Sequence, residues 1–132
     1  MSTQLIKLSR IAGAIALFLG VAHETYTFWF VDAVGQLHPS WQGLVLYMYL
    51  ATGLVCFLAS GAIFLSTSRS IQNMKVSHHI FLFSAIFMLL LGIGAPIAMR
   101  NNPFGYVSLA VGVFAVAVAI LRYRHSVISA PK

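Results

Sequence analysis

The chain has 132 residues, of which 60% are hydrophobic and 8% are charged, and its net charge is +6. A water-soluble domain of this length cannot bury so much apolar surface, so we expect the surplus to face lipid. We expect no nucleic-acid partner, because the basic residues stand at the ends of apolar runs, where they report membrane topology.

Four apolar runs are each about long enough for a helix that crosses a bilayer, which takes roughly 20 residues. They cover residues 8–31, 43–65, 79–99 and 104–121, and polar or turn-forming segments separate them. Runs such as AIFMLLLGIGAPIAM do not alternate apolar and polar residues as the strands of a membrane β-barrel do. The sequence predicts an all-α fold, an integral membrane four-helix bundle, with residues 1–132 forming a single transmembrane domain.

The positions of the basic residues predict the orientation of this bundle. Seven of them lie at the start of the first run, between the second and third, or after the fourth: Lys7, Arg10, Arg69, Lys75, Arg122, Arg124 and Lys132. Arg100 is the only one on the other side. By the positive-inside rule we expect the N and C termini to be cytoplasmic, in a multi-pass membrane protein. The first run also fits a secretory signal, but apolarity resumes through YTFWFV, so we expect it to span.

Small and polar residues recur at helical spacing in every run, and such residues mark the faces at which membrane helices pack. The predicted faces are Gly13, Gly20, Glu24, Thr27 and Val31, with Ala16 and His23 at the edge; Tyr49, Thr52, Gly53, Cys56, Ala59 and Ser60; Ser84, Met88 and Gly92; and Gly105, Ser108, Gly112, Ala115 and Ala119. Four such faces predict a compact bundle in which Glu24 points at protein.

The stretch GVAHETYTFWFV places two ionisable side chains, His23 and Glu24, inside an apolar run. A carboxylate in hydrocarbon costs about 2.5–3.5 kcal/mol by insertion scales, so a proton, a hydrogen bond or an ion pair must offset it. At 1.5 Å per residue, Glu24 lies about 21 Å beyond Arg10, in the outer half of the membrane. Polar residues expected in the same outer half form the predicted ligand-binding or proton site: His23, Glu24, Thr27, Tyr49, Thr52, Arg100 and Tyr106.

Three interpretations of this pocket stay open. Glu24 and His23 are a buried polar clamp between helices or subunits, a ligand or proton site, or metal ligands. The sequence HETYT lacks the HExxH spacing, and no second histidine lies at helical spacing on that face, so we expect no metal. No motif identifies a cofactor.

The lead-in LSR, the run IAGAIALFLGVAH and the layout of four helices resemble the DoxX-like group of small bacterial membrane proteins. Some members of that group accompany oxidoreductases that pass electrons to quinone. The resemblance implies a small inner-membrane subunit or accessory protein, in a homo-oligomer or a larger membrane complex, with a small apolar ligand or a quinone as a candidate partner. Two alternatives are a proton-coupled or small-molecule transporter or binding protein that uses Glu24, and a membrane enzyme that uses His23 and Glu24.

Overall fold

The computed structural model describes residues 1–98 and 103–128, which form four α-helices and no strand. The helices are α1 (Thr3–Val34), α2 (Pro39–Ser66), α3 (Lys75–Ala98) and α4 (Pro103–Ile128). Each contains a segment of 23 to 28 residues that is long and apolar enough to cross a membrane. The prediction of an all-α fold with four helices long and apolar enough to cross a membrane is confirmed.

The predicted helix ends are wrong by up to seven residues, because the helices continue past their apolar runs. Helix α1 begins directly after Ser2, whose side chain accepts a hydrogen bond from the backbone N–H of Leu5 at 3.3 Å. Helix α2 begins at Pro39, which suits a first helical position because proline has no N–H to leave unpaired. The outer segment predicted between the first two runs is therefore mostly helical, and only residues 35–38 connect α1 to α2.

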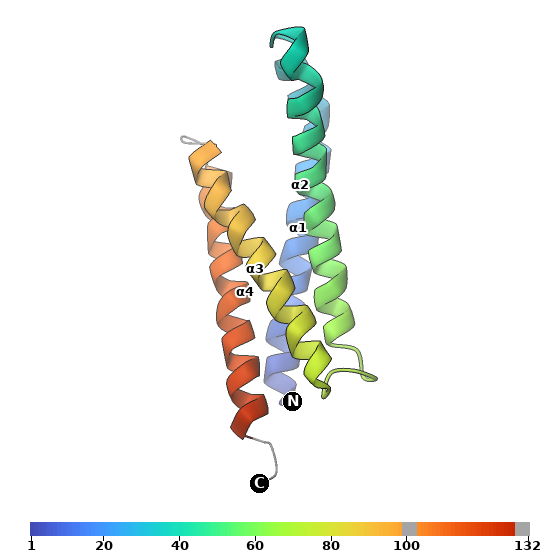
Figure 1. The fold of residues 1–132 in the computed structure, drawn as a ribbon, viewed down its shortest axis with the longest axis vertical. Helices are drawn as coiled ribbons and strands as arrows, with labels where there is room; N and C mark the ends of the chain where they lie inside the picture. The colour runs from blue at the N-terminus through green and yellow to red at the C-terminus, as the bar shows by residue number, and fades with distance from the viewer. Residues whose placement is uncertain (99–102, 129–132) are drawn as a thin grey trace.

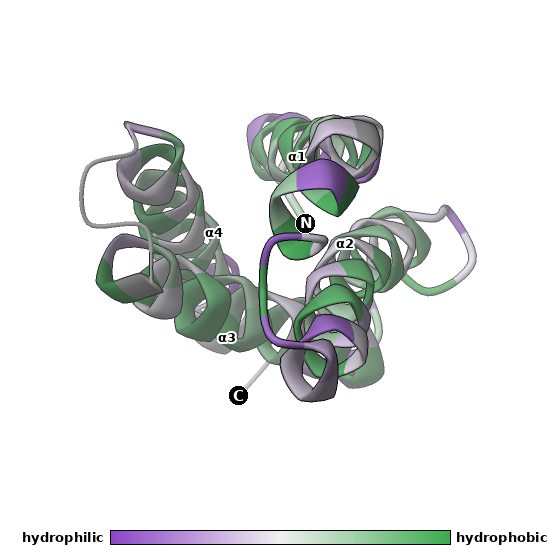
Figure 2. Ribbon diagram, turned by 90° about the horizontal axis from the view of Figure 1, so that it is seen from above, coloured by the Kyte–Doolittle hydropathy of each residue, from purple (hydrophilic) through white to green (hydrophobic). Residues whose placement is uncertain are grey.

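The four helices form a ring in chain order, since α1 contacts α2 and α4, and α3 contacts α2 and α4 (Figure 2). Contact is most extensive within two hairpins, α1–α2 and α3–α4. The hairpins converge at the end that holds the N-terminus, which we call the terminal end, and diverge towards the opposite end (Figure 1). The bundle is therefore less compact than the sequence predicted.

Glycines on both helices bring α3 and α4 into close backbone contact. A Cβ added at Gly92 would lie 2.7 Å from the carbonyl oxygen of Ser108, and one added at Gly112 would lie 2.6 Å from the Cα of Leu89. Gly105 packs in the same way against Ala95. The predicted packing faces of α3 and α4 are confirmed: of their eight residues, seven are buried and Ser108 is half-buried.

In hairpin α1–α2 the helices also pack closely at a glycine, and one hydrogen bond joins them. Gly20 packs against Cys56, and the Ser60 hydroxyl donates to the carbonyl oxygen of Gly13 at 2.8 Å. The predicted faces of these two helices are confirmed except at Val31, which is 46% exposed.

Replacing Gly112 with alanine will destabilise the fold, because the new Cβ would meet backbone atoms of α3 that cannot move aside freely. We expect a loss of about 1–3 kcal/mol in the free energy of unfolding, the usual effect of overpacking. Gly94→Ala is the matched control, since nothing lies within 4 Å of a Cβ built there. Thermal unfolding of the purified protein, followed by circular dichroism, measures both; equal melting temperatures would show that close packing at Gly112 does not stabilise the fold.

Candidate functional site

Glu24 lies on α1 where α2 presents a glycine. Its carboxylate and the methylene next to it occupy the space that a side chain at Gly53 would fill. Glu24 is half-buried, and it lies within the part of α1, Thr3–Thr27, that is long and apolar enough to cross a membrane. The bare backbone at Gly53 therefore makes room for an ionisable group between two helices.

The Glu24 side chain opens onto a groove of about 470 Å³ whose other walls belong to α2. The groove is lined by Glu24, Tyr47, Leu50, Ala51, Leu54 and Phe57. Ala59 and Ile63 of α2 belong to the buried clusters shared with α3 and α4, and Leu50 and Leu54 lie about half a turn around the helix from them. The groove therefore faces away from the α3–α4 hairpin, so Glu24 does not point wholly into protein as predicted.

Glu24 makes no hydrogen bond or ion pair with any residue that the structure describes. Two residues of the predicted site donate their hydroxyl protons elsewhere. The Tyr49 hydroxyl donates to the carbonyl oxygen of His23 at 2.9 Å, and the Thr52 hydroxyl donates to that of Met48 at 2.9 Å. Thr27 lies on the same helix as Glu24 and donates to the His23 carbonyl at 3.4 Å. Among the described residues, the carboxylate faces the groove without a partner.

His23 takes part in an aromatic stack instead of joining Glu24. Its ring lies 3.8 Å from the Tyr49 ring, centroid to centroid, and Tyr49 stacks in turn on Phe30 at 4.2 Å. The Nδ1 atom of His23 is buried and has no hydrogen-bond partner among the described residues. Ring stacking and hydrogen bonds therefore join His23 and Thr27 of α1 to Tyr49 of α2. Glu24 does not belong to this unit.

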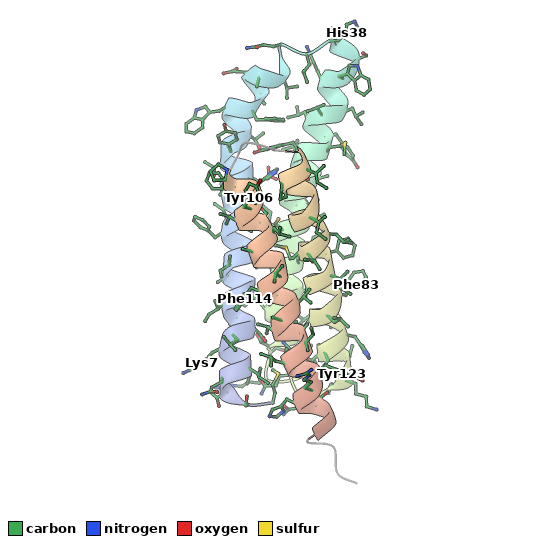
Figure 3. The ribbon with its side chains drawn as sticks, turned by 90° about the vertical axis from the view of Figure 1, so that its left-hand side faces the viewer. Lys7, His38, Phe83, Tyr106, Phe114 and Tyr123 are labelled. Carbon is green, nitrogen blue, oxygen red and sulfur yellow. The ribbon has the colours of Figure 1, made fainter. Side chains whose placement is uncertain are left out.

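The other two predicted site residues do not join this unit in the described part of the chain. Arg100 lies outside the described residues. Tyr106 is on α4, towards the opposite end of the molecule, and its side chain is 59% exposed (Figure 3). Depth alone placed Tyr106 near Glu24 in the prediction, but the two hairpins diverge, so equal depth does not bring these side chains together.

The sequence did not lead us to expect a second polar centre, which lies at the terminal end, where Arg122 is 1% exposed. The predicted fourth run ends at Leu121, which assigned Arg122 to the aqueous boundary. Helix α4 instead continues to Ile128, and the guanidinium of Arg122 lies between the four helices. Serines on the other three helices surround it.

The guanidinium of Arg122 joins all four helices. Its Nη1 donates to the hydroxyls of Ser9 on α1 (3.0 Å) and Ser66 on α2 (3.1 Å), and its Nη2 donates to the hydroxyl of Ser77 on α3 (2.6 Å). Nη2 also lies 3.3 Å from the Ser66 carbonyl oxygen, and the Phe81 ring packs 4.5 Å from the guanidinium carbon. Each serine hydroxyl donates its own proton to a backbone carbonyl, so each can only accept from Arg122.

Among the described residues, no carboxylate pairs with the guanidinium of Arg122 in this centre. The chain has only two acidic residues, Glu24 and Asp32, and both lie on the later half of α1, away from Arg122. Neutral oxygens and an aromatic face stabilise the charge in place of a carboxylate. The sequence does carry a signal that could have identified this centre. Three apolar runs have a serine at one end, at similar depth, and the fourth run has an arginine there.

Within residues 1–98 and 103–128, no three His, Cys, Asp or Glu side chains are grouped so as to hold a metal ion. Comparisons with protein-family models, with curated proteins and with solved structures find no match to this chain. A functional assignment therefore rests on the geometry of the Glu24 groove and of the Arg122 centre.

Removing one acceptor from Arg122 will cost more stability than removing an unrelated serine. We expect Ser77→Ala to lower the free energy of unfolding by about 1.5–3 kcal/mol, as for hydrogen bonds to charged groups. In an Arg122→Met background the same change will cost clearly less, because no cation then needs the oxygen. The measurement is a double-mutant cycle of unfolding free energies.

Ser84→Ala is the control for this cycle. Ser84 is also a buried serine of α3, and its hydroxyl donates to Ile80 of its own helix. Its effect should be the same in both backgrounds. If Ser77→Ala and Arg122→Met prove additive, the contact does not stabilise the fold as the geometry indicates.

Proposed function

We propose that this chain is a small multi-pass subunit or accessory protein of the bacterial inner membrane, which assembles with a second copy of itself or with a larger membrane complex. The face that assembles is the outward side of hairpin α1–α2. The observation that supports this proposal is the half-buried Glu24 carboxylate, which opens, without a partner among the described residues, onto a groove directed away from α3 and α4.

The cost of an unpaired charge favours a partner that inserts into the membrane. An unpaired carboxylate at this depth costs several kcal/mol, and lipid chains offer nothing to offset that cost. A neighbouring helix that brings a hydrogen-bond donor or a basic side chain to Glu24 would remove it, and Leu50 and Leu54 would pack against the same helix. Leu54 is 56% exposed in the single chain, so it is available for such packing.

The orientation and the setting follow from charge and from the resemblance to the DoxX-like group. Lys7, Arg10 and Arg69 are exposed at the terminal end, so by the positive-inside rule we place both termini in the cytoplasm. The DoxX-like layout supports a redox or quinone-linked complex as the larger partner.

A second candidate function is the binding or transport of a small molecule or a proton at Glu24. The groove volume of about 470 Å³ lies within the range of ligand pockets, roughly 300–1,000 Å³, and most of its lining is apolar. In this alternative the ligand is a small apolar molecule with a cationic or hydrogen-bond-donating group, and the carboxylate is its anchor.

Native mass spectrometry of the protein, gently extracted from its own membrane, distinguishes these functions. We expect the wild type to carry a second copy or a partner subunit, and Ala51→Phe, which fills the groove, to lose about nine-tenths of it. Ala110→Phe makes the same change at an exposed position of α4 and should keep the partner. A wild type without any protein partner, or equal loss in both variants, would overturn the assembly proposal.

Glu24→Gln separates assembly from ligand binding, and Asp32→Asn is its control because it removes the only other acidic charge. An amide can still form hydrogen bonds, so an assembled protein should keep its partner in Glu24→Gln. A bound small molecule that is lost in Glu24→Gln, and retained in Asp32→Asn, would support the second candidate function instead.

A further inference from the structure

A second, larger groove lies at the terminal end, on the opposite hairpin from the Glu24 groove. Its volume is about 1,200 Å³, and the start of α3 and the last turns of α4 form most of its walls. Tyr123, which lines it, projects from α4 near the level of Lys7 (Figure 3). None of the residues in the proposed assembly face contributes to this groove.

The polar side of this groove is basic. Lys75, His78 and His79 come from the first turn of α3, and Arg124 and His125 come from the end of α4. Lys75, His79 and Arg124 are exposed, whereas His78 is half-buried and its buried Nδ1 has no hydrogen-bond partner among the described residues. These side chains offer donors and positive charge, the chemistry that recognises a phosphate.

Neither acidic side chain of this chain lines the groove. Both acidic residues, Glu24 and Asp32, lie on the later half of α1. Among the residues that line the groove, no acidic side chain offsets the charge of Lys75 and Arg124. An anion in the groove would therefore interact favourably with both of these cations.

The other side of the groove is apolar and lies deeper along the helices. Leu82 follows Lys75 by seven residues, about 10 Å along α3, and Ile120 precedes Arg124 by four residues, about 6 Å along α4. Both of these apolar side chains are exposed, Leu82 at 40% and Ile120 at 49%. A basic rim followed by an apolar wall matches a ligand with an anionic head and an acyl chain, and it matches a soluble anion less well.

We propose that this groove binds an anionic glycerophospholipid of the surrounding membrane. The phosphate lies among Lys75, His78 and Arg124, and an acyl chain runs over Leu82 and Ile120. Basic pockets between membrane helices are known to bind lipid head groups by these interactions. The site would make one particular lipid part of the folded bundle, next to the Arg122 centre.

The test is native mass spectrometry of the full chain in detergent, titrated with phosphatidylglycerol and, separately, with zwitterionic phosphatidylcholine. We expect phosphatidylglycerol to bind with a defined stoichiometry, and Lys75→Gln/Arg124→Gln to weaken that binding by about tenfold or more. The control is Lys7→Gln/Arg69→Gln, which removes one lysine and one arginine at exposed positions outside the groove and should change the affinity less than about twofold.

Each of the following outcomes would overturn the proposal. Equal weakening in both double variants would show a diffuse attraction to anionic lipid, and equal binding of phosphatidylcholine would show that charge does not select the ligand. Competition by inorganic phosphate at matched concentration would show that the groove takes a soluble anion. Should Lys75→Gln/Arg124→Gln fail to fold by circular dichroism, Ile120→Trp decides: it fills the apolar wall and must weaken phosphatidylglycerol binding as well.

Discussion

The guanidinium of Arg122 is the contact on which the arrangement of the four helices depends. It lies where all four converge, and it donates to a serine hydroxyl on each of the other three. Hydrophobic packing cannot by itself hold helices together in lipid, because lipid chains are as apolar as the side chains. A buried cation that needs several oxygens at once specifies which helices meet and at which level, since a shift of one turn would leave it unpaired.

The divergence of the two hairpins follows from where the strong contacts lie. Close glycine packing operates within each hairpin, as at Gly92 and Gly112 between α3 and α4, whereas the Arg122 centre joins the hairpins only at the terminal end. Towards the opposite end the hairpins separate (Figure 1). One consequence is that Glu24 finds no partner on α3 or α4 among the described residues, and its groove opens to the outside of the bundle.

The sequence predicted the number of helices and their packing faces because apolar length and the spacing of small residues are local properties. It could not predict the helix ends. An apolar run shows which residues suit the hydrocarbon layer of a membrane, but a helix can continue beyond that run, as α4 does through Arg122. For the same reason the buried arginine was assigned to the boundary. The hydrogen-bond partners of Tyr49 and Thr52 depend on how α1 and α2 are rotated against each other, which residue spacing does not specify.

The fit of Glu24 into the space at Gly53 also constrains how this protein can change over evolutionary time. A side chain at position 53 would occupy the volume that the carboxylate now fills, so a larger residue there would require the Glu24 side chain to move or to be replaced by a smaller one. In related sequences, a glutamate at position 24 should occur with glycine at position 53, and larger residues at 53 should occur with small ones at 24. The pair would then be inherited as a unit, whatever the ionisable group is used for.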